Sequence, residues 1–237
     1  MLSIVDDLAG FGPLRMCAHA PRPDDPDDLT GLRVLLVADV LARVVELGGR
    51  TVLIGWTSSP SAAADAAGIR PADAHGTPEE LAEALGGPPA VNVTSRTYEG
   101  SGGVSLSVGE ALATDGGQRD ALALRLFLLG RPHHEPVDVT GEAVDAAAGK
   151  LANWRKSVAT WAEGPSKAMP ADLVRTAHAA LENGIDTPAV LRLLDDLAET
   201  TDVPGGAKFE TFAHLDRVLG LEVVRDVGRS HPADLYR

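Results

Sequence analysis

Two short apolar runs, Pro13-Leu-Arg-Met-Cys-Ala-His-Ala20 and Thr51-Val-Leu-Ile54, flank a long helical pattern. The pattern is LRVLLVADVLARVVEL, residues 32–47, and Gly48-Gly49 follows it. Apolar residues recur in it at helical spacing, whereas each flanking run has the length of a buried strand. The loop at 21–31 is dense in Pro and Asp, which is typical of a connection. These segments predict a strand, a crossover helix and a second strand parallel to the first.

The rest of the chain extends this pattern into two parts. Short helical stretches at 61–67 and 78–85 precede strand patterns at 90–94 and 104–108. Long amphipathic helices are expected at 118–129, 140–162, 170–183, 186–199 and 207–219. We therefore expect an α/β fold. A Rossmann-like parallel sheet of the nucleotide-binding type would occupy residues 1–116, and a helical bundle with a polar C-terminal tail would occupy residues 117–237.

The composition predicts a packed protein that does not enter a membrane. Of the 237 residues, 44% are hydrophobic, which is enough for a sizeable core and excludes disorder as the dominant state. Aromatic residues make up only 4%, so aliphatic side chains must build that core. The longest apolar run, Val34–Val45, is interrupted by Asp39 and Arg43 and is too short to cross a bilayer.

The charge and the cysteine content indicate which partners the protein binds and in which cellular compartment it lies. The chain has 21 Lys and Arg against 34 Asp and Glu, a formal charge of −13, which repels polyanions. We expect no binding of tRNA or other nucleic acid. Cys17 is the single cysteine, so no internal disulfide can form, and no charged and apolar leader precedes it. These features predict a cytoplasmic protein.

Several segments resemble one enzyme family. Asp120–Leu129, Pro136–Thr140, Leu151–Arg155 and Gly184–Leu191 resemble the helical domain of cysteinyl-tRNA synthetases and of the related mycothiol cysteine ligase. Within them, Asn153-Trp154-Arg155 is nearer to the ligase branch. The resemblance implies a class I synthetase-like fold that lacks the family's large inserted domain and anticodon-recognising region.

The same resemblance locates the family's two nucleotide-binding signatures. Val37–Leu41 resembles the family's F-D-V-L helix, and counting back from it puts the HIGH signature on Asp28-Leu29-Thr30-Gly31, without either histidine. Counting back from Val104–Val108 puts the KMSKS signature on Thr97–Ser101, without either lysine. The implied ligand-binding positions are Asp28, Leu29, Thr30, Gly31, Arg33, Arg96, Ser101 and Gly103. The implied substrate pocket contains Cys17, His19 and Trp56.

The loop before the first long helix carries acids where an adenylating enzyme needs cations. Activation of an amino acid by ATP requires preorganised positive groups around the phosphates. Asp24–Asp28 holds four aspartates, which repel phosphate, and only a helix N-terminus, Arg33 and Arg96 offset them. We therefore predict loss of adenylate formation. ATP with Mg²⁺ is the alternative cofactor if the two arginines replace the missing cations.

The family's zinc site is also expected to be absent. The resemblance implies zinc held by two Cys, a His and a Glu, with Arg15-Met16-Cys17 on the strand that carries the first cysteine. Here Cys17, His19 and His75 are the soft ligands of the N-terminal half, and tetrahedral zinc needs more ligands that converge. We predict no zinc and interpret Cys17 as a small buried side chain.

Four further motifs each have a structural and a functional interpretation. Asp24–Asp28 is either a hard-cation site or, as we prefer, a solvated loop that caps a helix. Glu99–Gly103 is a flexible loop in preference to a phosphate cradle, and His133-His134-Glu135 is a surface turn in preference to a metal site. Trp154 and Trp161 lie one heptad apart, which favours the bundle core over base stacking.

The leading functional hypothesis is a truncated, catalytically degenerate homologue of this family. It would act as an accessory protein that binds a protein partner or a small-molecule ligand, with no prediction of oligomeric state. The alternative is an ATP-dependent cysteine ligase or aminoacyl-transferring enzyme with a remodelled site. A cyclodipeptide-synthase-like enzyme ranks last, because Cys17–Ala20 offers no serine nucleophile.

Overall fold

The computed structural model describes residues 12–95, 102–117 and 119–229. Five parallel strands form one sheet in the order β3-β2-β1-β4-β5. The strands are β1 (Leu14–His19), β2 (Val52–Trp56), β3 (Ala74–His75), β4 (Val91–Thr94) and β5 (Val104–Ser107). This order is that of the Rossmann fold, so the predicted fold class is confirmed.

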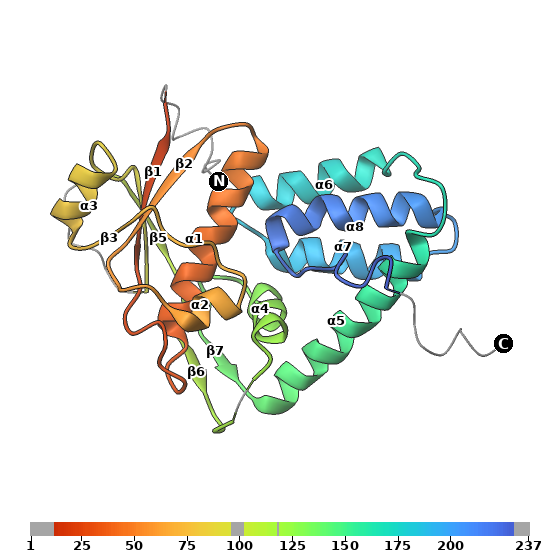
Figure 1. Ribbon diagram of the computed structural model, residues 1–237, viewed down its shortest axis with the longest axis horizontal. Coiled ribbons are helices and arrows are strands. Elements are labelled where there is room, and N and C mark those ends of the chain that lie inside the picture. Colours follow the sequence, from red (N-terminus) through yellow and green to blue (C-terminus); the bar gives the residue numbers. More distant parts are fainter. Residues whose placement is uncertain (1–11, 96–101, 118, 230–237) are drawn as a thin grey trace.

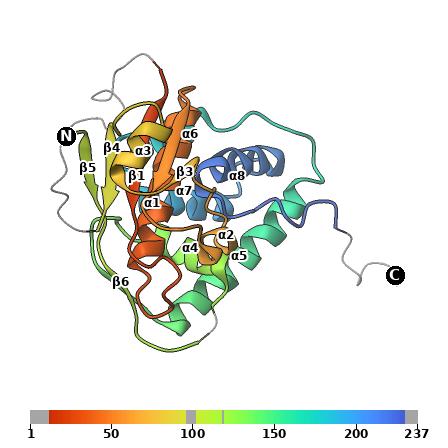
Figure 2. The ribbon, with the colours of Figure 1, turned by 60° about the vertical axis from the view of Figure 1, so that its left-hand side comes forward.

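Helix α1 (Thr30–Leu47) covers one face of this sheet. Figures 1 and 2 show it between the sheet and the helices of the second half of the chain. Most of its side chains are buried, on all sides of the helix, because it packs against the sheet and against α8 at once. Two shorter helices, α2 (Ala62–Ala66) and α3 (Pro78–Ala84), complete this half. Leu81 of α3 packs against Gly55, on the opposite face of the sheet from α1.

The predicted bundle is present. Its helices are α4 (Ala121–Leu129), α5 (Gly141–Trp161), α6 (Ala171–Glu182), α7 (Thr187–Glu199) and α8 (Gly205–Leu219). Asp186 accepts the N–H of Ala189 at the start of α7, and Gly220 ends α8 in the left-handed conformation, with φ of 62°. These boundary signals lie within a few residues of the predicted ends, so the five helices are confirmed.

The two tryptophans of α5 belong to the bundle core, as predicted. Trp154 and Trp161 each lie 5.3 Å, between ring centroids, from Phe212 of α8, which is fully buried. The Trp154 ring meets the Phe212 ring edge to face, a favoured aromatic geometry. The aromatic residues therefore join α5 to α8.

Three short strands were not predicted. They are β3 and a separate two-stranded parallel sheet, made of β6 (Ala111–Ala113) and β7 (Val137–Val139). Each has two or three residues, which is too few to show the alternation that identifies a strand. The small sheet joins the segments before and after α4. The predicted division between residues 116 and 117 falls between β6 and α4, and one apolar core continues across it.

A buried carboxylate ties the two halves together. Asp39 of α1 is 2% exposed, and its oxygens accept Arg125 Nη2 at 2.8 Å, Arg43 Nε at 2.9 Å and Arg70 Nε at 3.0 Å. Arg125 lies on α4 and also donates to the Leu219 carbonyl at the end of α8. Burial opposes ionisation of Asp39, but Arg125 and Arg43 outweigh it and hold the pKa of the carboxyl below its usual range.

Within the described ranges, no helix combines the length and the apolar character needed to span a bilayer.

Candidate functional site

The strand order reverses at the junction of β1 and β4. In open parallel sheets, ligands bind outside the carboxyl ends of the strands at such a switch point. His19 and Thr94 are register partners at the carboxyl ends of the two strands. The candidate site therefore comprises this edge of the sheet and the start of α1.

Polar side chains cluster at the switch point. His19 Nε2 lies 3.0 Å from Asn92 Oδ1, and Asn92 Nδ2 donates to the Gly102 carbonyl at 3.1 Å. Asn92 is completely buried on β4, so it links β1 to the segment that enters β5. Thr94 is also buried. Of these three side chains, His19 is therefore the one that reaches the surface at this edge.

The three predicted substrate-pocket residues differ in access. Cys17 and Trp56 are 1% and 2% exposed, whereas His19 is partly exposed. Burial raises the pKa of the Cys17 thiol to about 12, which leaves it protonated and unreactive at neutral pH. The interpretation of Cys17 as a small buried side chain is therefore confirmed. Trp56 packs edge to face against His75, with ring centroids 5.4 Å apart.

The start of α1 is occupied by other parts of the chain. Leu29 and Thr30 are buried, and the Leu29 N–H donates to the Ala111 carbonyl at 2.9 Å. The Thr30 hydroxyl accepts the Ala111 N–H at 3.0 Å. Asp28 Oδ1 accepts the Thr30 N–H at 3.2 Å, but Leu29 is the N-cap residue and no side chain caps α1, so the prediction that Asp28 caps this helix is wrong. These contacts take up groups that a bound phosphate would use.

The loop before α1 folds back over the helix start at Gly31. A Cβ atom built on Gly31 would lie 1.9 Å from the carbonyl oxygen of Pro21 and 3.0 Å from Cα of Pro23. Only glycine allows the loop backbone to come this close. The loop is further held by Arg22, which pairs with both Asp25 and Asp28. Asp25 and Asp28 therefore bind within the loop and at the start of α1, whereas Asp24 accepts the Ser61 hydroxyl and the Ala63 N–H at the start of α2.

This close approach gives a first prediction. Gly31→Ala must displace the loop backbone, so we expect it to lower the free energy of unfolding by about 1–3 kcal/mol. The matched control is Gly149→Ala in the exposed middle of α5, where no atom lies within 4 Å of the added Cβ. That change should raise stability by about 0.5–1 kcal/mol, because alanine is the better helix former. Urea unfolding measures both, and equal effects would contradict the closed helix start.

Arg33 is engaged in the interior. Its side chain is 1% exposed and donates to the carbonyls of Gly109, Glu110, Pro132 and Glu135 at 2.6–3.2 Å. Burial lowers the pKa of its guanidinium to about 10, against the attraction of Glu135, so it remains charged at neutral pH. With four carbonyls bound, this arginine holds together the turns around β6 and β7. Because its guanidinium is bound to these carbonyls, Arg33 is not available to bind a phosphate, which was its predicted role.

The other predicted ligand positions are structural or lie elsewhere. Gly103 has φ of 77°, and a Cβ there would lie 2.7 Å from the Pro89 carbonyl oxygen, so glycine is needed for the chain path. Arg96 and Ser101, and with them the counterpart of the KMSKS signature, lie outside the described residues. Among residues 12–95, 102–117 and 119–229, no three His, Cys, Asp or Glu side chains converge on a metal-sized site.

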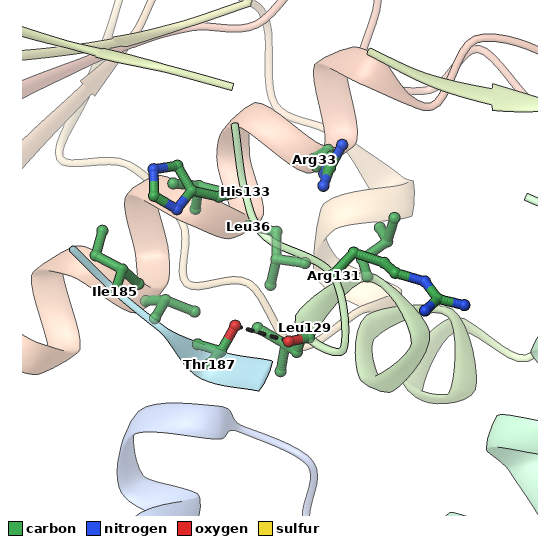
Figure 3. A pocket seen from close by; sticks show the side chains of 10 residues that line it. Arg33, Leu36, Leu129, Arg131, His133, Ile185 and Thr187 are labelled. Atoms are coloured by element: carbon green, nitrogen blue, oxygen red, sulfur yellow. Dashed lines mark hydrogen bonds between the residues drawn. The ribbon is translucent and has the colours of Figure 1, made fainter. Parts of the chain in front are cut away.

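A small cavity lies between α1, α4 and the turn that follows α4. Figure 3 shows His133, Ile185 and Thr187 around it, with Arg33 and Leu36 contributed by α1. The Thr187 hydroxyl donates to the Leu129 carbonyl at 2.7 Å. The cavity volume of about 10 Å³ is that of one water molecule, so it is too small for a substrate. His133 is therefore not simply part of a surface turn, as the sequence had indicated, because its ring faces this interior space.

His133 gives a second prediction, on pH. Burial, His134 and Arg33 together lower the pKa of His133 to about 4, whereas the unfolded chain takes up this proton near pH 6.5. The neutral ring thus stabilises the fold fully above pH 6.5, and this contribution is lost as the pH falls towards 4. We expect a loss of about 1–2 kcal/mol over this window, with partial exposure taken into account. Unfolding curves of native protein and His133→Gln, compared at each pH, isolate the effect. Parallel pH profiles would contradict it.

Comparison with known proteins gives a partial match. No protein-family model matches the chain. An L-cysteine:1D-myo-inositol 2-amino-2-deoxy-alpha-D-glucopyranoside ligase 2 from Corynebacterium urealyticum is 34% identical over 88 residues, which are 37% of this chain and 19% of that protein. The corresponding ligase from Beutenbergia cavernae is 35% identical over 79 residues, 33% of this chain and 18% of that protein. The matched part of the chain thus covers under a fifth of either relative. Over about a third of its length the chain is similar to mycothiol cysteine ligases, the branch to which Asn153-Trp154-Arg155 is nearer.

Proposed function

We propose that this protein is a degenerate relative of the mycothiol cysteine ligases that has lost ATP-dependent adenylate formation and binds a small, uncharged polar ligand in an accessory role. The partial similarity to these ligases supports the ligase-like origin. The observation that carries the loss of activity is the closed start of α1, where the Pro21 carbonyl lies against Gly31. A triphosphate would need this space and the N–H groups around it.

The charges near this site support the same proposal. Arg33 is bound to four carbonyls, and Asp25 and Asp28 lie on the loop that covers the helix start. Adenylate formation needs cations aimed at the phosphates. The partly exposed imidazole of His19 at the carboxyl end of β1 supports a ligand that hydrogen-bonds without formal charge, such as an amino sugar in its free-base form or a polyol. In the second version of this proposal, a partner protein and not a small molecule binds at the carboxyl edge of β1 and β4.

The test is direct binding and turnover with the full chain. Calorimetric titrations would use ATP with Mg²⁺, L-cysteine, a non-hydrolysable cysteinyl-adenylate mimic and the amino-sugar inositol named in the relatives. Pyrophosphate release would be followed with ATP, cysteine and the amino sugar together. We expect no pyrophosphate release and no measurable binding of ATP or of the adenylate mimic. The amino-sugar inositol should bind, and His19→Ala should weaken that binding.

The matched control is His75→Ala, which removes an exposed imidazole from the edge strand β3, two strands away from β1. It should leave binding of the amino sugar unchanged. Micromolar binding of the adenylate mimic, or release of pyrophosphate, would instead favour an active ligase with a remodelled site. Failure of every small molecule to bind would contradict the ligand-binding form of the proposal.

A further inference from the structure

We propose that His178 of α6 and His214 of α8 form a pH-sensitive latch: their imidazoles join the two helices while at least one ring is neutral, and protonation of both rings releases α6 from α8. The two Nε2 atoms lie 2.9 Å apart, which is the distance of a direct hydrogen bond. The ring centroids are 5.1 Å apart and the ring planes are inclined by 31°. The latch lies in the helical half of the chain, where Figure 1 shows α6 alongside α8, and it does not depend on the function proposed above.

A hydrogen bond between two imidazoles limits the number of protons that the pair can carry. In the neutral pair, the Nε2–H of one ring donates to the lone pair of Nε2 on the other ring. One added proton leaves this bond in place, because an imidazolium still donates to a neutral ring. A second added proton occupies the accepting nitrogen, so the bond is lost and two positive rings face each other. The contact between the helices therefore ends when both rings are protonated.

The charges beside the pair oppose the second proton. Arg217 lies one turn after His214 on α8, and burial, His178 and Arg217, in that order, lower the pKa of His214. On α6, Arg175 and Glu182 lie one turn before and one turn after His178 and line the same groove. Histidine ordinarily titrates near pH 6.5, so the second proton of the pair is taken up below that value. The latch is therefore closed at neutral pH and opens as the pH falls.

The other charged side chains of the helices packed here have partners of their own or are exposed. On α8, Glu210 accepts the Ser166 hydroxyl at 2.6 Å, and Asp216 accepts backbone N–H groups after the helix end. Arg43 of α1, a helix that packs against α8, is bound to Asp39. The remaining ion pairs are Lys150 of α5 with Asp195 of α7 and, on α6, Arg175 with Asp172; Arg155 of α5 binds two carbonyls, and Lys156, Arg192, Asp196 and Glu199 are exposed. The charged groups that act on His214 are His178 and Arg217.

Helix α6 is held by few buried side chains. Of its 12 residues, Ala177 and Leu181 are buried, whereas α7 buries six of its 13 residues. It packs chiefly against α7, and its other side lines an open groove of about 720 Å³. Elements with little apolar burial open locally at a lower free energy than the rest of a protein. Loss of the bond to α8 can therefore free α6 while the remaining fold persists.

The first test reads where the two rings carry their protons, in the full chain. Long-range ¹H–¹⁵N spectra at about pH 8 distinguish protons on Nε2 from protons on Nδ1, and the single changes His178→Gln and His214→Gln assign the signals. The two rings should together carry one proton on Nε2 and one on Nδ1, because only one Nε2–H fits between them. Protons on Nε2 of both rings would overturn the latch.

The second test is amide hydrogen exchange, corrected for the intrinsic effect of pH on exchange. From pH 7.5 to 5.0, the protection of α6 in native protein should fall at least about tenfold more than that of α5. Glutamine at position 178 can bond to His214 whether that ring is neutral or charged, so His178→Gln should keep α6 protected at both pH values. The matched control is His133→Gln, which removes the other titrating ring and should leave the fall in α6 unchanged.

Two results of the exchange experiment would also overturn the proposal. One is an equal fall in protection for α6 and α5 in native protein, which is expected of a bond that only joins the helices. The other is an undiminished fall for α6 in His178→Gln. If this variant folds poorly, His214→Gln is measured in its place, because glutamine there can likewise bond to either form of His178.

Discussion

Asp39→Asn should lower the free energy of unfolding by about 3–5 kcal/mol, because it leaves a buried guanidinium without its counter-charge. The side chain of Arg125 is completely buried, and its charge is balanced by Asp39 Oδ2 at 2.8 Å. Arg43 and Arg70 are more exposed, and water can solvate them when the carboxylate charge is removed. Urea unfolding monitored by tryptophan fluorescence would measure the change.

The control for Asp39 is an ion pair on the surface. Asp172→Asn breaks the pair with Arg175, in which both side chains are more than 70% exposed, and should change stability by less than about 0.5 kcal/mol. The double variant Asp39→Asn with Arg125→Gln should lose less than the sum of the two single variants, because no unpaired buried charge remains. A loss below about 1 kcal/mol for Asp39→Asn alone would contradict the view that this carboxylate joins the two halves.

Phe212→Ala should cost about 3–5 kcal/mol, the usual range for removal of a fully buried aromatic ring. Phe212 is 0% exposed and touches both Trp154 and Trp161, so its removal leaves a cavity that two indoles border. The near-ultraviolet circular dichroism of the tryptophans should change with it. Phe209→Ala, on the same helix at a partly buried position, is the matched control and should cost clearly less. Equal losses for the two variants would show that α5 and α8 are not joined through Phe212.

The main elements could be predicted because their signals are local. Apolar periodicity, the Asp186-Thr187-Pro188 helix start and the Gly220 stop depend on neighbours in sequence, and the structure follows them. β6 and β7 could not be predicted in this way. Their pairing depends on Arg33, which binds carbonyls about 76 to 102 residues further along the chain. Asp39 and Arg125 are likewise 86 residues apart, so no window of sequence shows them as partners.

The candidate site was predictable in location and not in detail. The counterpart of the HIGH signature was placed on Asp28–Gly31, and α1 does begin there, at Thr30. The aspartate-rich loop also carries a cation that the sequence analysis did not weigh, Arg22, which pairs with Asp25 and Asp28. The sequence could not show that Pro21 lies on Gly31, because a close backbone approach leaves no pattern beyond a single glycine. Nor did it show that the guanidinium of Arg33 turns towards the carbonyls around β6 and β7, since either direction fits a residue in the first turn of a helix.

The approach of Pro21 to Gly31 also limits how the proposed loss of adenylate formation could be reversed. Counting back from Val37–Leu41 places the second histidine of the HIGH signature on Gly31 itself, where even a methyl group would lie 1.9 Å from a backbone oxygen. Introducing histidines at the two HIGH positions, Asp28 and Gly31, would therefore displace the loop and would not by itself form a nucleotide site. Reversion requires the loop to be rerouted or shortened first. Single substitutions are therefore not expected to restore a nucleotide site in this chain.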